Sequence, residues 1–360
     1  MKVSHTLDLY TDYLIVQNSH ATATGCSDLI DNKVAHDTFT RALSIDDYDS
    51  EFLWKNIKTD VRLAQNSNGV LILDNSIIAK PYSEVNELIN YHYDHAVGDI
   101  VKGINLLTAL VQYDEMSFPV GFETGIKDQI CIKENKNGKE IMGRKSRYTL
   151  NQLACSLVKQ ALLNGIKFTH ILGDIWFASK DNLRFFHKHK LKFVLGISSN
   201  RLVATSLSDV KSGQYQQLKD LELNDGESRK VYLKDILFPV VVTRKVFKNG
   251  DESKGELYLV TNDLTLEGDH IYDFYQRRWN VEVYHRSIKQ NSSAGKSPTK
   301  VKQTQLNHVC LSLIAFSKLE KLKLKSDKNH YALKRQLLIA ANQASYRELL
   351  SMRKKLKMTA

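Results

Sequence analysis

The sequence predicts an α/β protein in which a mixed sheet is flanked by helices, interrupted by a β-rich insertion and preceded by a helical region. Two apolar runs, residues 69–74 and 168–174, have the length of buried strands, and each ends in an aspartate. A helical pattern occupies residues 149–165 between them. Residues 198–262 are polar and β-prone, whereas the chain from residue 268 onward is helical in pattern.

The composition is that of a globular protein with a basic balance of charge. The 360 residues are 42% hydrophobic and 25% charged, which excludes disorder as the main property of the chain. This length suffices for one large domain with smaller modules. The formal net charge of +11 makes a polyanion the first partner to test, because Lys and Arg gain affinity for phosphates by releasing counterions.

The four cysteines and the N-terminus indicate a cytoplasmic protein. The cysteines lie far apart and show no zinc-ligand spacing, so we expect reduced, mostly buried thiols. The first 16 residues contain Asp8 and Asp12 and lack the cationic start and apolar stretch of a signal peptide. No segment approaches the roughly 20 apolar residues that a membrane helix needs. We therefore expect no membrane partner.

Residues 13–63 are helical in pattern with short loops. Segments 22–30 and 34–43 around a polar turn fit a helix-turn-helix. The second segment offers four polar side chains on its exposed side: His36, Asp37, Thr40 and Arg41. A small helical bundle packed on Phe39 and Leu43 is the alternative, and periodicity alone favours it.

The central elements follow from apolar runs and capping signals. Asp74 is expected at the tip of its strand, at the edge of the sheet, with further strands around residues 76–79 and 104–112. Thr149 and Gly165 predict the start and stop of a helix, and Asp174 again follows a strand.

The segment after Asp174 predicts a further helix and a return to strand. Ser179 predicts a helix cap, and a strand follows at residues 192–197. The neighbouring His187 and His189 point to different faces of that helix, so a solvated helix end is favoured over a metal site. In the insertion, strands at 239–243 and 256–261 are expected about a turn at 249–250.

One helical segment places four polar side chains together. At about 100° per residue, offsets of three, seven and fourteen return to nearly the same direction. A helix over residues 275–289 would therefore present one polar face, formed by Tyr275, Arg278, Glu282 and Lys289. A seam beside that face repeats every seven residues and can anchor the helix to the core. It consists of Phe274, Val281 and Ile288.

These residues carry a specific resemblance. The segment is similar to the Y-x-x-R-x-x-x-E-x-x-x-x-x-x-K signature of bacterial insertion-sequence transposases with a ribonuclease-H-like DDE core. Further segments resemble that group in the same order along the chain: residues 71–76, 80–82, 93–95, 102–105, 173–174 and 296–299. Residues 34–41 also look like the N-terminal part of such enzymes, which favours the helix-turn-helix. The resemblance implies a ribonuclease-H-like mixed sheet.

The resemblance also implies an active site. Asp74, Asp174 and Glu282 would be the catalytic residues and would bind two Mg²⁺ or Mn²⁺ ions, since hard cations require oxygen ligands and two such ions promote in-line displacement at phosphorus. Without metal these acids repel one another, so we expect at least one to have a raised pKa. Cutting of insertion-sequence ends and strand transfer into target DNA would follow.

DNA contacts follow from the same resemblance. Tyr275, Arg278 and Lys289 would contact phosphates at the transposon end, and His36, Thr40 and Arg41 would belong to the N-terminal DNA-binding region. The expected partners are double-stranded DNA, at terminal inverted repeats and target sites, and a second copy of the chain in the synaptic complex. The expected location is the bacterial cytoplasm, in association with the nucleoid.

The patterns along the chain, together with the resemblance, divide it into five parts. They are an N-terminal helical DNA-binding region (1–66), the first part of the catalytic core (67–197), the β-rich insertion (198–262), the second part of the core with the signature helix (263–315) and a basic helical region (316–360). A catalytically silent regulator derived from a transposase and a related DNA nuclease remain the alternatives.

Two departures from the family pattern bear on the mechanism. Many relatives have a second acid after the first catalytic aspartate, where this chain has Asn75. Hairpin-forming relatives commonly use an aromatic residue of the insertion to hold a flipped base, and residues 198–262 contain no Trp. Four other aromatic side chains could substitute for it: Tyr215, Tyr232, Phe238 and Phe247. Hairpin and non-hairpin cleavage both stay open.

Overall fold

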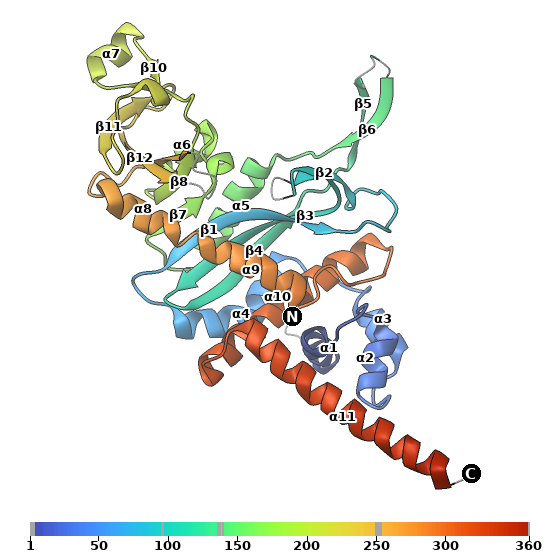
Figure 1. Cartoon of the computed structure of the whole chain (residues 1–360). Coiled ribbons are helices and arrows are strands. Elements are labelled where there is room, and N and C mark those ends of the chain that lie inside the picture. The colour runs from blue at the N-terminus through green and yellow to red at the C-terminus, as the bar shows by residue number, and fades with distance from the viewer. Residues whose placement is uncertain (1–3, 95–96, 135–137, 139, 249–253, 359–360) are drawn as a thin grey trace. The chain divides into compact units, whose positions relative to one another are not determined.

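The computed structural model describes residues 4–94, 97–134, 138, 140–248 and 254–358. The chain divides into two compact units. One unit is the continuous segment Val61–Tyr284 and contains the sheet, and the other joins Met1–Asp60 to His285–Ala360 and is helical (Figure 1). Among the described residues, no helix combines the length and apolar character needed to cross a membrane.

Five strands form the centre of the sheet in the Val61–Tyr284 unit. Their order is β4 (Met116–Thr124), β3 (Asp99–Tyr113), β1 (Val70–Ala79), β7 (His170–Gly173) and β8 (Lys192–Ile197). β1 runs antiparallel to β3 and parallel to β7, and β7 runs parallel to β8. Strand β2 (Asn90–Asp94) pairs with the first half of β3. This mixed sheet with flanking helices confirms the predicted ribonuclease-H-like α/β class.

Two helices beside the sheet begin at the predicted caps. α5 (Leu150–Leu163) starts with a capping box in which Thr149 and Gln152 bond reciprocally, and Gly165 follows it with a φ of 63°, a conformation that glycine adopts without strain. Its buried side chains face the core: Ala154, Leu157, Val158 and Ala161. α6 (Lys180–Lys188) is capped by the Ser179 side chain. Both predicted helices are therefore confirmed.

The insertion extends the same sheet. It contains β9 (Leu202–Ala204), α7 (Leu207–Ser212), β10 (Gln216–Gln217), a 3-10 turn (Leu218–Asp220), β11 (Ser228–Leu233), β12 (Val240–Lys248) and β13 (Lys254–Thr261). β13 pairs antiparallel with β8, so the strands of the insertion continue from the core. The predicted β-rich character is confirmed, and the turn expected at residues 249–250 lies outside the described residues. A separate ribbon, not predicted, consists of β5 (Gln129–Glu134) and β6 (Glu140–Lys145) (Figure 1).

The helical unit contains α1 (His5–Val16), α2 (Ala23–Leu29), α3 (His36–Ala42), most of α4 (Ser50–Ala64), α10 (Lys302–Ser326) and α11 (His330–Met358). Tyr10 of α1 hydrogen-bonds His308 of α10 at 3.0 Å between its hydroxyl and Nδ1. The buried Lys334 of α11 donates to the carbonyl oxygens of Ile15 and Gln17, where α1 leaves carbonyls unpaired. N-terminal and C-terminal segments therefore form one core.

Two predictions about element boundaries were wrong. Asp74 does not end its strand, because β1 continues to Ala79 and β3 supplies hydrogen-bonding partners along its whole length. The expected separate strand at residues 76–79 is the second half of β1. The single helix expected over residues 275–289 is two helices, α8 (Gly268–Gln276) and α9 (Trp279–Gln290).

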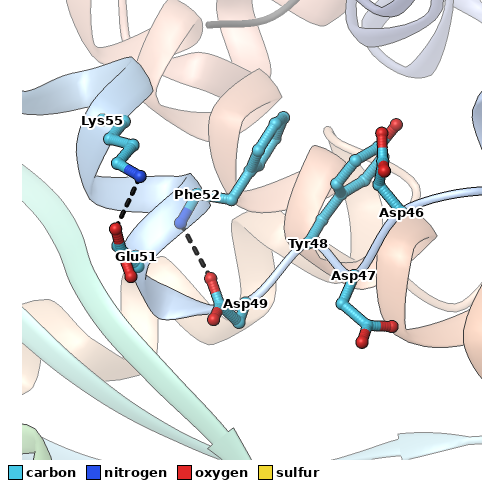
Figure 2. A pocket seen from close by; sticks show the side chains of 7 residues that line it. All are labelled: Asp46, Asp47, Tyr48, Asp49, Glu51, Phe52 and Lys55. Atoms are coloured by element: carbon cyan, nitrogen blue, oxygen red, sulfur yellow. Dashed lines mark hydrogen bonds and ion pairs between the residues drawn. The ribbon is translucent and has the colours of Figure 1, made fainter. Parts of the chain in front are cut away.

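An acidic pocket lies at the start of α4 (Figure 2). Its cavity of about 270 Å³ is lined by four carboxylate side chains and by Tyr48, Phe52 and Lys55. Lys55 pairs with Glu51 at 2.5 Å, and Asp49 accepts a hydrogen bond from the Phe52 amide. The remaining negative charge would repel phosphates, so this pocket is a poor site for DNA.

Candidate metal centre

Asp74 lies in the middle of β1 with strands on both sides. Its Cα is paired with Thr108 of β3, and the preceding Leu73 is paired with Gly173 of β7. The residue is only 7% exposed. Its Oδ1 accepts a hydrogen bond of 3.0 Å from the Asn75 amide. An apolar strand thus holds a carboxylate in a largely buried position.

Asp174 leaves the neighbouring strand at the same level. It follows Gly173 directly and caps a 3-10 turn (Ile175–Phe177) by accepting a 2.9 Å hydrogen bond from the Trp176 amide. A Cβ on Gly173 would lie 3.0–3.2 Å from Phe177 and Leu195, so glycine allows the turn to pack closely on the sheet. Parallel pairing of β1 and β7 brings the two predicted aspartates to adjacent strands.

Glu282 reaches Asp74 from α9. The helix is anchored two residues later, where the buried Tyr284 hydroxyl hydrogen-bonds the Thr108 hydroxyl at 3.2 Å. Thr108 is the cross-strand partner of Asp74, so this contact fixes the helix beside the carboxylate. Val281 and Ile288 are fully buried, as predicted for the apolar seam, whereas Phe274 of α8 is half-buried. The side chain of Glu282 is 43% exposed.

Arg278 lies between the two carboxylates. Its Nη1 is 3.6 Å from Asp74 Oδ2 and 3.4 Å from Glu282 Oε1. Arg278 lies in the short break between α8 and α9, and it contacts Glu282 four residues later although the predicted continuous helix is absent. Its guanidinium also lies 5.6 Å from the Tyr275 ring and 5.8 Å from the Trp279 ring.

Tyr275 is buried beneath this cluster. It is 7% exposed, and its hydroxyl would lie 3.3 Å from a Cβ on Gly196 of β8. The missing side chain of Gly196 therefore allows α8 to approach the sheet. Burial raises the pKa of Tyr275. Tyr275 is therefore less accessible to a DNA phosphate than the prediction of an exposed polar face implied.

Burial acts on the pKa of Asp74 more strongly than the expected repulsion between the acids does. Burial raises the pKa of Asp74 to about 7, and the negative charges of Asp174 and Glu282 add to the effect. The Arg278 cation opposes it. Burial alone would lower the pKa of Arg278, but its acidic and phenolic neighbours raise the pKa above its ordinary value. The prediction that one carboxyl has a raised pKa is confirmed.

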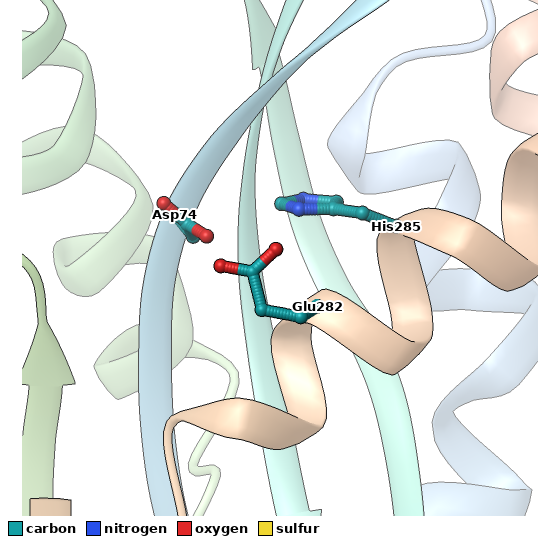
Figure 3. Close-up of side chains that lie close together, drawn as sticks. All are labelled: Asp74, Glu282 and His285. Carbon is teal, nitrogen blue, oxygen red and sulfur yellow. The ribbon is translucent and has the colours of Figure 1, made fainter. Parts of the chain in front are cut away.

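Metal-ligating atoms converge at this point (Figure 3). Asp74, Glu282 and His285 each offer one ligand atom, and these atoms lie within 4.8 Å of one another. His285 lies one turn after Glu282 on α9, and sequence reasoning missed it; its spacing of three from Glu282 was the available signal. Asp174 is not part of this close group, although its charge acts on Asp74. The two carboxylates are ligands that suit Mg²⁺ or Mn²⁺, whereas the imidazole is a donor that later transition metals bind more readily.

The remaining residues predicted to contact DNA lie on separate helices, α3 and α9. His36, Thr40 and Arg41 are exposed on α3, while Phe39 on the same helix is buried. Lys289 is half-buried near the end of α9. Helix-turn-helix and small bundle are both compatible with this arrangement, because the buried Phe39 and Leu43 pack inward while the polar side chains face solvent.

Three other sequence features have defined surroundings. Asn75, in place of a second acid, donates to Asn105 Oδ1 at 3.1 Å. Tyr93 is 57% exposed on β2, and His95 lies outside the described residues. Of the aromatic candidates in the insertion, Phe238 is buried and stacks on His187 at 3.7 Å, whereas the other three are half-buried.

Comparison with known families gives two matches. A family model described as DDE superfamily endonuclease matches residues 4–219, and one described as transposase DDE domain matches residues 149–317. The first match covers Asp74 and Asp174, and the second covers Asp174 and Glu282. A search among curated proteins gave no match.

Proposed function

The chain belongs to the DDE superfamily of endonucleases and transposases, and on this premise we propose that it cleaves DNA at the ends of an insertion sequence and joins those ends to target DNA. The observation that supports the proposal is the close approach of Asp74 to Glu282, with Asp174 directly after the neighbouring strand β7 and its charge acting on Asp74. Enzymes of this superfamily use divalent metal, and the acids of this cluster suit it.

Asp74, Asp174 and Glu282 would hold the metal, with His285 as an additional donor. Two bound Mg²⁺ or Mn²⁺ ions would activate the attacking oxygen and stabilise the leaving one. The rigid strands β1 and β7 position two of the ligands, and α9 brings the third. Burial of Asp74 excludes bulk water from one side of the site, which strengthens its interaction with a cation.

The chain's cations would hold the DNA backbone. Arg278 lies beside the carboxylates, where a phosphate at the transposon end would approach them, and Lys289 lies farther along α9. Tyr275 would support Arg278 from below through its ring. The exposed His36, Thr40 and Arg41 would contact the terminal repeats, and two copies would assemble on paired ends.

A labelled-end assay with Mg²⁺ tests the proposal. The substrate is the DNA that flanks the gene, including its inverted repeats, and the products are separated by size. Joined products are expected from a transposase, since the freed 3′-hydroxyl attacks target DNA. Cleavage without joining would support a nuclease instead, and binding without cleavage would support the silent regulator.

Two variants separate catalysis from binding. Glu282→Ala should abolish cleavage and leave end binding largely intact, so strong residual cleavage would remove Glu282 from the active site. Lys289→Ala should weaken binding and reduce the slope of log affinity against log salt by about 1, because one phosphate contact is lost. An unchanged slope would argue against the phosphate role of Lys289.

A further inference from the structure

Arg278 occupies the place of a cation at the candidate metal centre. Its Nη1 contacts one oxygen of Asp74 and one of Glu282, at 3.6 and 3.4 Å, and its side chain is 14% exposed. These two side chains are also proposed metal ligands, so Arg278 and a divalent ion interact with the same pair of carboxylates.

We propose that Arg278 is a displaceable counter-cation. In the metal-free protein it neutralises Asp74 and Glu282, and binding of divalent ions displaces its guanidinium, which becomes available for a DNA phosphate. Metal binding and DNA binding are thereby coupled through one side chain. This inference rests on the proposed function, because it takes Asp74 and Glu282 as the metal ligands.

The geometry of the contacts suits displacement. A structural arginine typically forms paired, short hydrogen bonds to one carboxylate. Here a single nitrogen makes both contacts, and both are longer than the 2.7–2.9 Å usual for charge-assisted bonds. Arg278 Nε is buried and has no hydrogen-bond partner among the residues that the structure describes. The guanidinium is therefore only partly satisfied where it lies.

The surroundings explain both the need for a cation and a route for its movement. Asp74 is buried, and in its ionised form a buried carboxylate is stabilised by a neighbouring cation. Arg278 belongs to the break between α8 and α9 rather than to a regular helix. The faces of Tyr275 and Trp279 lie within 6 Å of its guanidinium and can stabilise the cation as it moves.

Calorimetric titration of the full chain with Mn²⁺, without DNA and at about pH 8.5 so that carboxylates are ionised, tests the competition. Arg278→Gln removes the charge and should bind Mn²⁺ about tenfold more tightly, as expected for loss of one nearby cation. Arg278→Lys keeps the charge and should bind nearly as the wild type does. Arg277→Gln is the matched control, because Arg277 lies in the same break but donates to Gln112 at 3.3 Å.

Thermal unfolding supplies a second readout that a merely structural role would not move. With EDTA, Arg278→Gln should melt below the wild type, and saturating Mn²⁺ should remove most of that difference. An equal loss with and without Mn²⁺, or an Mn²⁺ affinity that is unchanged or weaker, would overturn the counter-cation role.

Asp74→Asn distinguishes this inference from the proposed function. If Asp74→Asn binds Mn²⁺ as tightly as the wild type, the metal assignment itself fails. If Asp74→Asn loses Mn²⁺ binding while Arg278→Gln gains none, only the displacement of Arg278 fails. End binding should also strengthen on addition of Ca²⁺ in the wild type, and this strengthening should be absent in Arg278→Gln.

Discussion

Asp74 and Asp174 follow similar apolar runs on adjacent parallel strands, yet the two carboxylates occupy different environments. Asp74 stays within β1, is 7% exposed and has a pKa raised to about 7. Asp174 turns away from the sheet, is half-buried and caps a 3-10 turn. Both side chains accept a hydrogen bond from a backbone amide, so the backbone that follows each aspartate decides how deeply its carboxylate is buried.

The largest expected effect comes from removing the buried charge. Asp74→Asn should lower DNA cleavage by about three orders of magnitude or more, because the proposed metal ligand is lost while the shape of the side chain is kept. Cleavage rates under single-turnover conditions measure this. Asn75→Ala is the neighbouring control and should retain most activity. Comparable losses in both variants would mean that local packing, and not the charge of Asp74, is responsible.

The second effect is a pH dependence of stability that comes from Asp74. Its pKa is about 7 in the folded protein and about 4 when unfolded, so the folded state holds more protons between these values. Without metal, stability should therefore fall as pH rises from about 4 to 7, by at most about 4 kcal/mol from this group. Asp74→Asn lacks the charge and should lose this component. Melting curves with EDTA across that range measure the difference.

The third prediction concerns the hydrogen bond that anchors α9 beside Asp74. Thr108→Val leaves the buried Tyr284 hydroxyl without its 3.2 Å partner and should cost about 1–3 kcal/mol of unfolding free energy. Tyr284→Phe removes the other half of the pair. The double variant should cost clearly less than the sum of the single ones, as measured by denaturant unfolding; additive losses would contradict the anchor.

The smallest effect on stability is expected at Asp174, and it separates capping of the turn from the proposed catalytic role. Asp174→Ala should cost about 1 kcal/mol of stability because the Trp176 amide loses its acceptor. Asp174→Ser can still cap the turn and should recover that stability. Neither variant should cleave DNA, since neither supplies a carboxylate. Cleavage by the serine variant would show that Asp174 is only a cap.

Apolar runs and caps made much of the sheet predictable. The strands before both aspartates, the helix between Thr149 and Gly165 and the Ser179 cap depend on local chemistry that a sequence displays directly. The end of β1 was not predictable from Asp74 alone, because pairing with β3 maintains the strand through the polar Asn75 and Ser76. At this point, pairing with a strand that is distant in the sequence has more influence on the backbone than the polarity of the local residues.

The candidate site was predictable in its residues more than in its geometry. Signature spacing placed Arg278 and Glu282 correctly beside each other, but the break at residues 277–278 was missed because no Pro or Gly marks it. His285 was missed because a lone histidine on an apolar helix face is usually a core residue. Only the approach of α9 to β1 shows that it shares a cluster with Asp74.

Two of the three tryptophans adjoin the candidate metal centre, and this gives the protein a built-in optical reporter. The amide of Trp176 is bonded to Asp174, and the ring of Trp279 lies 5.8 Å from Arg278; both indoles are more than half exposed. Trp54, the third, is buried and contributes a steady background to the emission. Intrinsic fluorescence can therefore follow the arrival of ions and DNA in real time without an attached dye.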